Sequence, residues 1–384
     1  CSEMRVKARH DNTMIDYFDI TINGDDFPEI GKAVMTHHPG GAKTKSFTEV
    51  KVCADKEAPH FSARVENGAE RMRFSGSPAL WLQGHNGMGS NDFTGLVKAS
   101  VLLVFKTLKL DCPASVIEAL NTGNYAVDEV HVAEHYTMPL GLISWLCDNI
   151  RRYADPTLEA IPIRPGMGVR LHPNSRDRQI LIYNKHHYFL DGLPKHKRKL
   201  LGRMPMDFDR VGTNLYFDHM LEQFLAEGAR IEARLKRCLK NKNRLFNHGS
   251  LWHPETARAL HLETVQAIPL QDLPPLDKRE LLLQTAKLEH RTLIALWLDG
   301  RRPMDFCKSP STYYRRRQEV LQQYGIDLSI PALRDDAINW ASITNLEGIM
   351  EPPDWALESG FVYEPSRWIG WRDATQNERA WLRA

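Results

Sequence analysis

The chain has 384 residues, which is enough for two domains of ordinary size. Hydrophobic residues make up 42% of it, so global disorder is excluded, while a formal net charge of +2 predicts no particular partner. The six cysteines lie far apart and form no C-x-x-C pair, which argues against a zinc ribbon or a disulfide framework and indicates a reducing compartment. With no signal peptide and no bilayer-spanning apolar run, we expect a soluble cytoplasmic protein that contacts no membrane.

The first part of the chain alternates strand-like and helix-like segments. Short β-friendly runs bounded by turn residues predict strands over residues 14–22, 60–65 and 71–75. Apolar residues at helical spacing predict helices over residues 92–110 and 139–153. Three later stretches also resemble strands, over residues 126–133, 178–185 and 229–235. The last alternates cleanly, so Arg230, Glu232 and Arg234 are expected on one face and the apolar residues between them on the other.

After about residue 246 the predicted strands fade, and proline-containing linkers separate helical stretches. We therefore expect a sheet-containing domain over residues 14–246 and a mostly helical C-terminal domain over residues 247–384. Two basic stretches, over residues 195–199 and 236–244, follow predicted strands. Each is a candidate for phosphate contacts, although a solvated charged face explains each equally well.

Glutamate and histidine alternate with apolar residues around residue 130. On a strand, Glu129, His131 and His135 would point to one side, with Val130 and Val132 on the other. Carboxylate and imidazole groups at this spacing can reach one divalent ion, and the mixture suits Mg²⁺ or Mn²⁺. A solvated edge strand with incidental histidines has the same pattern, so the pattern alone does not decide.

Tyr183 and Lys185 lie two residues apart on the strand expected over residues 178–185, and would share a face. A tyrosine can attack a phosphodiester if its phenol loses a proton, and a neighbouring ammonium or metal ion favours the phenolate. Lys185 could also neutralise charge on the phosphate in the transition state. Tyrosine is also a common strand residue, and the spacing alone favours that simpler interpretation.

A glycine-rich segment, SPALWLQGHNGMG, occupies residues 77–89. It lacks the G-K-[ST] ending of a phosphate-binding loop, so it predicts only a tight loop that exposes His85 and Asn86.

The C-terminal part contains a second candidate for DNA contact. Residues 292–298 predict a helix, and Ser309 followed by Pro310 predicts the start of another. The second helix carries three consecutive arginines, Arg315, Arg316 and Arg317. A helix, a turn and an arginine-rich helix are typical of a helix-turn-helix whose second helix enters a major groove. Such surfaces are also common in helices that bind no DNA.

Together these motifs resemble the gene II replication initiators of Ff-type filamentous phages. SPALWLQGHNGMGSND is similar to their S-P-A-x-x-L-Q-G-H-N segment, and MIDYFDI at Met14 resembles their start, which makes residues 1–13 an extension. RQILIYNKH, ARIEARLKRCL and EPPDWALESGFVYEP resemble three further segments in the same order. The resemblance covers nearly the whole chain, to about Pro365.

The resemblance implies an α+β protein, with an antiparallel-sheet nicking domain of the HUH-like rolling-circle class before the helical domain. Such enzymes nick the plus-strand origin of phage or plasmid DNA in the bacterial host cytoplasm. They form a 5′-phosphotyrosine, release a 3′-hydroxyl for a host polymerase and later rejoin the ends. Origin DNA, as a single strand or a supercoiled duplex, and a host helicase and polymerase are the expected partners.

The resemblance also assigns roles to residues. Tyr183 falls on the catalytic tyrosine, and Lys185 is expected to assist it. The metal-site strand falls on residues 127–135, where Glu129 and His131 replace the family's Arg and Asp. The expected ligands of Mg²⁺ or Mn²⁺ are His131, Glu129, Glu232 and His135. The expected DNA contacts are His85, Asn86, Lys197, Arg198, Arg315, Arg316 and Arg317.

Two alternatives stay open. The departures at Glu129 and His131 also suit a regulator that keeps the fold and binds origin DNA but has lost the chemistry. An ordinary phosphodiesterase with a water nucleophile would cut DNA without remaining attached to it. The nicking hypothesis requires the Tyr183 phenol and the His131 imidazole to lie on the same side of the sheet. Opposite sides would leave only a DNA binder.

Overall fold

The computed structural model describes residues 13–25, 27–37, 43–53, 60–66, 70–138, 159–164, 168–192, 213–236, 246–268, 286–299, 301–324, 326, 328–329, 349–363 and 365, with single positions 143, 146, 147, 150 and 283. Several predicted features lie outside these residues. They are Lys197 and Arg198 with the rest of the 195–199 run, most of the helix expected over 139–153, and most of the basic stretch over 236–244.

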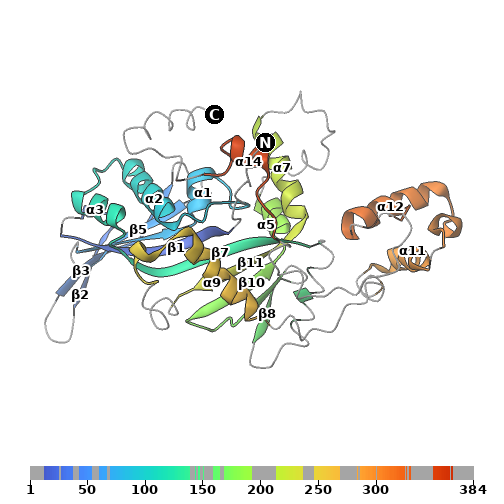
Figure 1. The fold of residues 1–384 in the computed structure, drawn as a ribbon, viewed down its shortest axis with the longest axis horizontal. Coiled ribbons are helices and arrows are strands. Elements are labelled where there is room, and N and C mark those ends of the chain that lie inside the picture. Colours follow the sequence, from blue (N-terminus) through green and yellow to red (C-terminus); the bar gives the residue numbers. More distant parts are fainter. Residues whose placement is uncertain are drawn as a thin grey trace, which may run out of the picture.

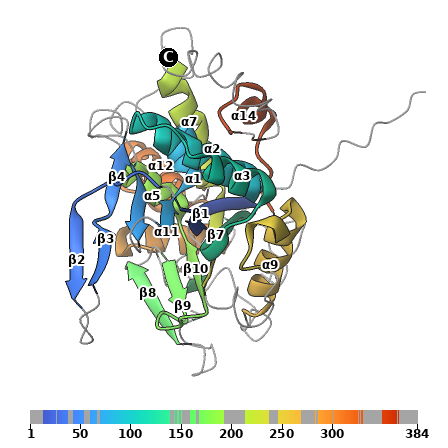
Figure 2. The ribbon, with the colours of Figure 1, turned by 90° about the vertical axis from the view of Figure 1, so that its left-hand side faces the viewer.

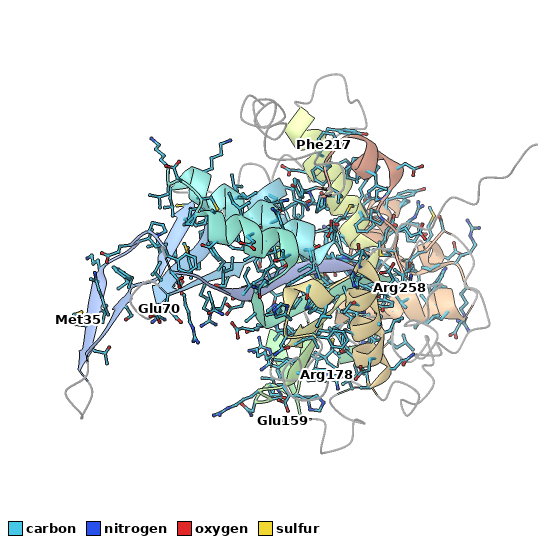
Figure 3. All side chains as sticks on the ribbon, turned by 60° about the vertical axis from the view of Figure 1, so that its left-hand side comes forward. Met35, Glu70, Glu159, Arg178, Phe217 and Arg258 are labelled. Carbon is cyan, nitrogen blue, oxygen red and sulfur yellow. The ribbon has the colours of Figure 1, made fainter. Side chains whose placement is uncertain are left out.

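A nine-stranded antiparallel sheet forms the centre of the protein, in the order β4-β5-β6-β1-β7-β11-β10-β9-β8 (Figure 1). Its strands are β1 (Met14–Asn23), β4 (Val50–Cys53), β5 (His60–Glu66), β6 (Arg71–Gly76), β7 (Ala126–Thr137), β8 (Ala160–Arg164), β9 (Gly168–Leu171), β10 (Arg178–Tyr183) and β11 (Gly228–Leu235). A separate hairpin of β2 (Ala33–His37) and β3 (Lys43–Phe47) extends from the body, with the half-exposed Met35 on it (Figure 3). The expected mixture of helices with an antiparallel sheet is confirmed.

One face of the sheet is apolar and covered by helices. Over β1, β5 and β6 lie α2 (Phe93–Thr107) and α3 (Ala114–Thr122), with α1 (Pro78–Gln83) packed beside β1, and their contacts with the strands form a core rich in phenylalanine. Side chains cap two of these helices: Asp92 Oδ1 accepts from Gly95 N over 2.9 Å, and Ser77 Oγ accepts from Leu80 N over 3.4 Å. Alternation along the strands, as at Phe61 in β5, directs every second side chain into this core.

Residues after position 246 also pack on the sheet. Helix α9 (Pro254–Gln266) covers the apolar face of β7 and β11 on the side of the molecule opposite the β2–β3 hairpin (Figure 2). Trp252 belongs to the main core, and isolated bridges join Ala126 to His248 and Tyr136 to Ile349. The packing therefore continues across the boundary predicted between residues 246 and 247, because the apolar face of the central strands needs the cover that α9 supplies.

Helix α7 (Thr213–Ala226) runs directly into β11 and packs beside it. Its apolar residues form a smaller core with α14 (Asp354–Glu358) and with Met88 of the glycine-rich segment. Residues near position 360 are thereby held close to the segment that follows α1, although 276 residues of sequence separate His85 from Phe361.

A second group of helices has its own core. It consists of α11 (Leu288–Leu298), a 3₁₀ turn (Pro303–Phe306) and α12 (Pro310–Tyr324), which lie apart from the sheet in Figure 1. Ser309 Oγ accepts from Thr312 N over 3.3 Å, so it caps α12 as predicted. Among the described helices, none combines the length and apolar composition that crossing a membrane requires.

Candidate active site

The other face of the central strands carries polar side chains, and we call it the polar face. On β7 it presents Glu129 and His131, while Val130 and Val132 lie in the apolar core, as predicted. The register brings His131 opposite Tyr17 of β1 and Arg234 of β11. The Tyr17 ring stacks on His131 at 4.6 Å between centroids. The predicted alternation of β7 and β11 is therefore correct, and it creates this face.

A chain of hydrogen bonds and close contacts joins the two residues on which the nicking hypothesis depends. The Tyr183 hydroxyl donates to Glu232 Oε2 over 3.0 Å. The other oxygen of this carboxylate, Oε1, lies 3.2 Å from His131 Nδ1, and His131 Nε2 lies 2.7 Å from Glu129 Oε1. The phenol and the imidazole thus lie on the same side of the sheet, linked by Glu232.

The charges around this chain set its protonation. Burial disfavours ionisation of Glu232, but His131, Arg234 and Arg230 outweigh it and hold the pKa of that carboxyl far below its usual range. Burial alone would lower the pKa of His131, yet its two carboxylate partners raise the pKa above the ordinary value. Burial raises the pKa of Tyr183 well above 10.0, and Arg230 opposes this rise without cancelling it. The resting phenol is therefore protonated.

Lys185 does not lie on the strand with Tyr183. The prediction of a strand over residues 178–185 is wrong at its end, because β10 stops at Tyr183 and Lys185 begins helix α5 (Lys185–Gly192). Asn184 Oδ1 accepts from His187 N over 3.0 Å, and this cap starts the helix. The Lys185 ammonium instead donates to Asn86 Oδ1 over 2.7 Å. Burial, with Arg230 adding to it, lowers the pKa of Lys185 to about 8.

The prediction that His85 and Asn86 are exposed on a loop is also wrong. The His85 ring stacks on Phe361 at 4.0 Å, its Nε2 lies 2.9 Å from the Phe361 carbonyl oxygen, and burial lowers its pKa to about 4. The Asn86 amide nitrogen donates to Asp16 Oδ1 over 2.9 Å. Residues 361–363 return to this loop from far along the chain, so the local sequence could not show the contact.

Two buried charges beside the phenol were missed. Arg230 was expected on the polar face but given no role, and Asp16 was given none. Arg230 is fully buried, and its Nη2 lies 2.9 Å from Asp16 Oδ1. Asp16 lies where the register of β1 against β7 shifts, between Ile15 and Tyr17. An acidic residue within the apolar run MIDYFDI was the available signal.

His135 lies on the polar face but away from His131. It pairs in register with Arg230, its ring contacts Phe224 at 5.7 Å, and its Nε2 has no hydrogen-bond partner among the described residues. Burial, together with Arg230 and Lys185, lowers the pKa of His135 well below 6.5. His135 lies four residues along β7 from His131, so the structure does not bring it next to the other expected ligands.

The two remaining expected ligands, Glu129 and Glu232, lie on opposite sides of the His131 ring. Glu129 and Glu232 contact opposite ring nitrogens, so they do not converge on one point. Lys236 Nζ lies 3.4 Å from Glu129, whereas Glu232 also contacts Tyr183. The donor chemistry of the His131–Glu232 edge suits a hard divalent cation next to the phenol, and Glu129 falls outside that edge.

Among the described residues, the trio of potential ligands that does converge within 4.8 Å is Glu289, His290 and Glu319, in the second group of helices. The buried His290 Nε2 lies 3.0 Å from Glu319 Oε2, which joins α11 to α12.

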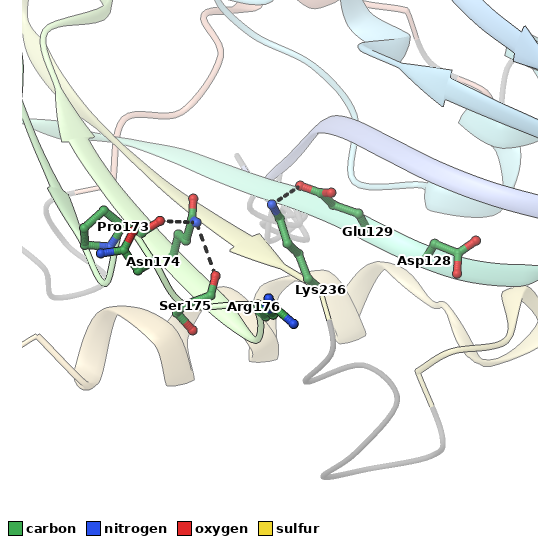
Figure 4. Close-up of a pocket in the computed structure, with 8 residues that line it drawn as sticks. Asp128, Glu129, Pro173, Asn174, Ser175, Arg176 and Lys236 are labelled. Atoms are coloured by element: carbon green, nitrogen blue, oxygen red, sulfur yellow. Dashed lines mark hydrogen bonds and ion pairs between the residues drawn. The ribbon is translucent and has the colours of Figure 1, made fainter. Parts of the chain in front are cut away.

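Two pockets open on the sheet near this site, one beside Glu129 and one beside Tyr17. A pocket of about 520 Å³ is lined by Asp128, Glu129, Pro173, Asn174, Ser175, Arg176, Gln179 and Lys236. Figure 4 shows Lys236 reaching to Glu129. The Gln179 side-chain amide donates to the main-chain oxygens of Pro173 and Ser175, in the turn that forms one wall of the pocket. A smaller pocket of about 170 Å³ lies beside Tyr17, with the Arg73–Asp19 ion pair in its lining.

The arginines expected to contact DNA lie on α12. Arg315 is 70% exposed and its Nε lies 3.8 Å from Glu319 Oε1, while Arg316 and Arg317 are partly buried.

Comparison with known proteins identifies the chain. A model of the family Phage CRI, described as the N-terminal part of the phage replication-associated protein, matches residues 14–255. The chain is 24% identical over 273 residues to the replication-associated protein of Enterobacteria phage I2-2, covering 71% of this chain and 73% of that protein. A solved rolling-circle replication initiator protein from Geobacillus stearothermophilus is 12% identical, with a TM-score of 0.27, over 73% of this chain and 91% of that one.

The family match covers more than half of the chain and begins at Met14, where the resemblance to gene II initiators begins. The chain is therefore a replication-associated protein. It belongs to the Phage CRI family of phage replication-associated proteins, and the predicted resemblance is confirmed.

Proposed function

We propose that this protein is a rolling-circle replication initiator that nicks origin DNA with Tyr183 and rejoins the ends. The observation that supports this best is the contact from the Tyr183 hydroxyl through Glu232 to His131 on one side of the sheet. The nucleophile Tyr183, the proton acceptor Glu232 and the potential metal ligand His131 are thus joined by successive contacts. The family membership supports a role in replication but does not by itself assign the chemistry.

The proposed step forms one bond and breaks another. The Tyr183 oxygen attacks the scissile phosphorus, and its proton passes to Glu232 Oε2, the partner of its hydrogen bond. The phosphorus–O3′ bond breaks, the 3′ oxygen takes up a proton from solvent, and the 5′ phosphate remains on the tyrosine. The covalent link retains the energy of the broken bond, so rejoining the ends requires no ATP.

The high pKa of the buried phenol and the low pKa of the Glu232 carboxyl both oppose this proton transfer, so positive charge near the phosphate is essential. Arg230 and Lys185 supply part of it. A Mg²⁺ or Mn²⁺ ion held by His131 and Glu232 would add charge that stabilises the developing negative oxygens. Glu129 pairs with the far nitrogen of His131, which is the arrangement that orients a histidine ligand.

The direct test is to incubate the protein with Mn²⁺ and a supercoiled plasmid that carries the origin of the genome encoding it. A protein–DNA adduct that survives denaturation is expected. Tyr183→Phe should keep DNA binding and reduce nicking and adduct formation together by more than about a thousandfold. Tyr188, whose ring meets that of Tyr183 at 5.3 Å, is the matched control, and Tyr188→Phe should still form the adduct.

Each other result identifies a different function. An adduct that survives Tyr183→Phe but not Tyr188→Phe would move the nucleophile to Tyr188. Cleavage without an adduct would indicate a water-using phosphodiesterase. Binding without cleavage would indicate a regulator that lacks the chemistry, an alternative that one observation favours: Arg234 and Lys236 already contact Glu232 and Glu129.

The helices α11 and α12 are the proposed helix-turn-helix, with Arg315, Arg316 and Arg317 contacting DNA phosphates. Replacing the three arginines with glutamine should reduce the salt dependence of origin binding by about 0.9 in log–log slope for each phosphate that is no longer neutralised. An unchanged slope would remove this assignment. The 3′-hydroxyl released by nicking would prime a host polymerase, with a host helicase opening the duplex in the cytoplasm.

A further inference from the structure

Asn86, the last residue of the Q-G-H-N motif, lies between two side chains of opposite charge. Its amide nitrogen donates to Asp16 Oδ1 over 2.9 Å, and its amide oxygen accepts from Lys185 Nζ over 2.7 Å. Because an amide donates through nitrogen and accepts through oxygen, these two contacts define its orientation. A neutral group therefore separates a carboxylate from an ammonium that would otherwise attract each other.

Asp16 is paired with Arg230 instead. Arg230 Nη2 lies 2.9 Å from Asp16 Oδ1, and the guanidinium is fully buried. The same guanidinium also donates to the main-chain oxygen of Asn86. The negative charge of Asp16 is thus taken up by Arg230. Within the described part of the chain, no carboxylate forms an ion pair with Lys185, whose ammonium bonds the Asn86 oxygen.

The Lys185 ammonium shares its electrostatic surroundings with the phenol. Lys185 follows Tyr183 by two residues, and Arg230, the partner of Tyr183 in the register of β10 and β11, donates to the main-chain oxygen of the same Asn86 whose side chain binds Lys185. Arg230, Asp16 and Glu232 also shift the pKa of both Tyr183 and Lys185. The two groups therefore lie at the same end of the polar face, next to the same charges. A phosphate attacked by Tyr183 comes within the field of the Lys185 ammonium, and its negative charge is the partner that this ammonium lacks.

The loop that carries Asn86 is anchored on both sides. Gly84 ends helix α1 in the left-handed region, with φ of 81°, which favours glycine. The Gln83 side-chain amide donates to the Met88 carbonyl oxygen over 2.7 Å, and the ring of His85 stacks on Phe361. The position of the Asn86 amide is consequently set by the loop rather than by Lys185.

We infer that Asn86 is a positioning residue that keeps Lys185 apart from Asp16, so that the Lys185 ammonium binds the scissile phosphate of the DNA strand. The inference rests on the proposed function, because it takes the phosphate next to Tyr183 as the ligand. Without this spacer, Lys185 would approach Asp16 and share its negative charge with Arg230, which would leave less positive charge for the phosphate. On this inference, the Q-G-H-N motif positions the Lys185 ammonium to bind the DNA phosphate and does not contact DNA itself.

The test compares two single-stranded origin oligonucleotides that differ only at the nick position. One carries the natural phosphodiester and the other a neutral methylphosphonate. Affinity is measured in the Tyr183→Phe protein, which binds without cutting. A charge-assisted contact should favour the phosphodiester by roughly 10- to 100-fold. Lys185→Gln in the same protein should reduce this preference to about threefold or less.

Asn86→Asp is the decisive variant, because it keeps the shape of the side chain and gives Lys185 a carboxylate partner. It should reduce the preference as far as Lys185→Gln does. Asn121→Asp is the matched control, since Lys98 Nζ donates to Asn121 Oδ1 over the same 2.7 Å on the exposed side of α2 and α3. That control should keep the full preference. If Asn86→Asp fails to fold, judged by its melting temperature, Asn86→Ser takes its place with the same expectation.

The possible failures are distinguishable. A folded Asn86 variant with the full phosphodiester preference would overturn the role of Asn86, while the adduct formed by the unaltered protein would still support the proposed function. Equal affinity for both oligonucleotides in the Tyr183→Phe protein would overturn the placement of Lys185 against the phosphate. Absence of any adduct in the unaltered protein would reject the proposed function itself.

Discussion

Strand β7 contributes to a histidine–glutamate pair on each of its two faces, and the two pairs have different surroundings. On the polar face, His131 lies between Glu129 and Glu232, at 2.7 and 3.2 Å. On the covered face, Glu134 Oε2 lies 3.2 Å from Nδ1 of His261 on α9, and both side chains are fully buried. The residue types and the nitrogen–oxygen distances of the two pairs are alike, so neither property distinguishes a reactive pair from a structural one.

The difference lies in what surrounds each pair. Glu134 also accepts from the hydroxyls of Thr13 and Tyr136, so a full set of donors surrounds it, and α9 closes the site. These donors and His261 outweigh the effect of burial and lower the pKa of Glu134 to about 2. The polar-face pair instead continues to the phenol and opens into a pocket. A closed, satisfied pair stabilises the fold, whereas an open pair linked to a nucleophile is available for chemistry.

The largest effect is expected for Glu232→Gln, which keeps the size of the side chain but removes the proton acceptor. This variant tests whether the polar-face pair takes part in the chemistry. Nicking and adduct formation per folded molecule should fall by about 10²- to 10⁴-fold. The rate of nicking of supercoiled origin DNA measures the effect. If the variant cuts at the normal rate, Glu232 is not the proton acceptor.

His261→Ala should have the opposite profile. Removing one partner of the closed pair leaves a buried Glu134 charge, which should lower the free energy of unfolding by about 3–5 kcal/mol. The folded fraction should nick DNA at a normal rate. Denaturant unfolding together with the rate per folded molecule provides the measurement. A stable but inactive His261→Ala protein would show that the covered face takes part in the chemistry.

His131→Ala tests whether the open pair holds a metal ion. Treating the unaltered protein with EDTA should stop cleavage, and His131→Ala should reproduce that effect, with metal affinity reduced by about 10- to 100-fold or more. Mn²⁺ titration of the nicking rate measures the affinity. A variant with the original Mn²⁺ requirement would exclude His131 as a ligand.

A smaller effect is expected from pH, which should change the nicking rate through the polar face and the stability through the covered face. Lys185, with its pKa near 8, is charged below that pH, so nicking should fall as the pH rises and be about tenfold slower at pH 9 than at pH 7. Lys185→Arg should remove this fall.

On the covered face, the folded pKa of Glu134 is lowered from 4.5 to about 2. Its contribution to stability is thus complete above about pH 4.5 and is lost as the pH falls towards 2. Stability rather than catalysis should respond in that acidic range.

Several parts of the site could be predicted because they depend on local geometry. The period of two along a strand placed His131 and Glu129 opposite Val130 and Val132, and did the same for Glu232 on β11. The predicted strand end after Tyr183 was wrong, because the Asn184 cap starts a helix one residue later. A two-residue step on a strand and the first turn of a helix look alike in a short sequence.

The sequence by itself determined which side chains share a face on β7 and β11, where α12 begins, and that the chain resembles the gene II initiators. Only the tertiary structure decided which of those side chains meet. The contacts of Asp16 with Arg230 and of Asn86 with Lys185 cross large separations along the chain. They depend on how the loop after α1 and the helix α5 pack around the sheet. Local periodicity carries no information about such contacts, because they result from packing between elements that are distant in sequence.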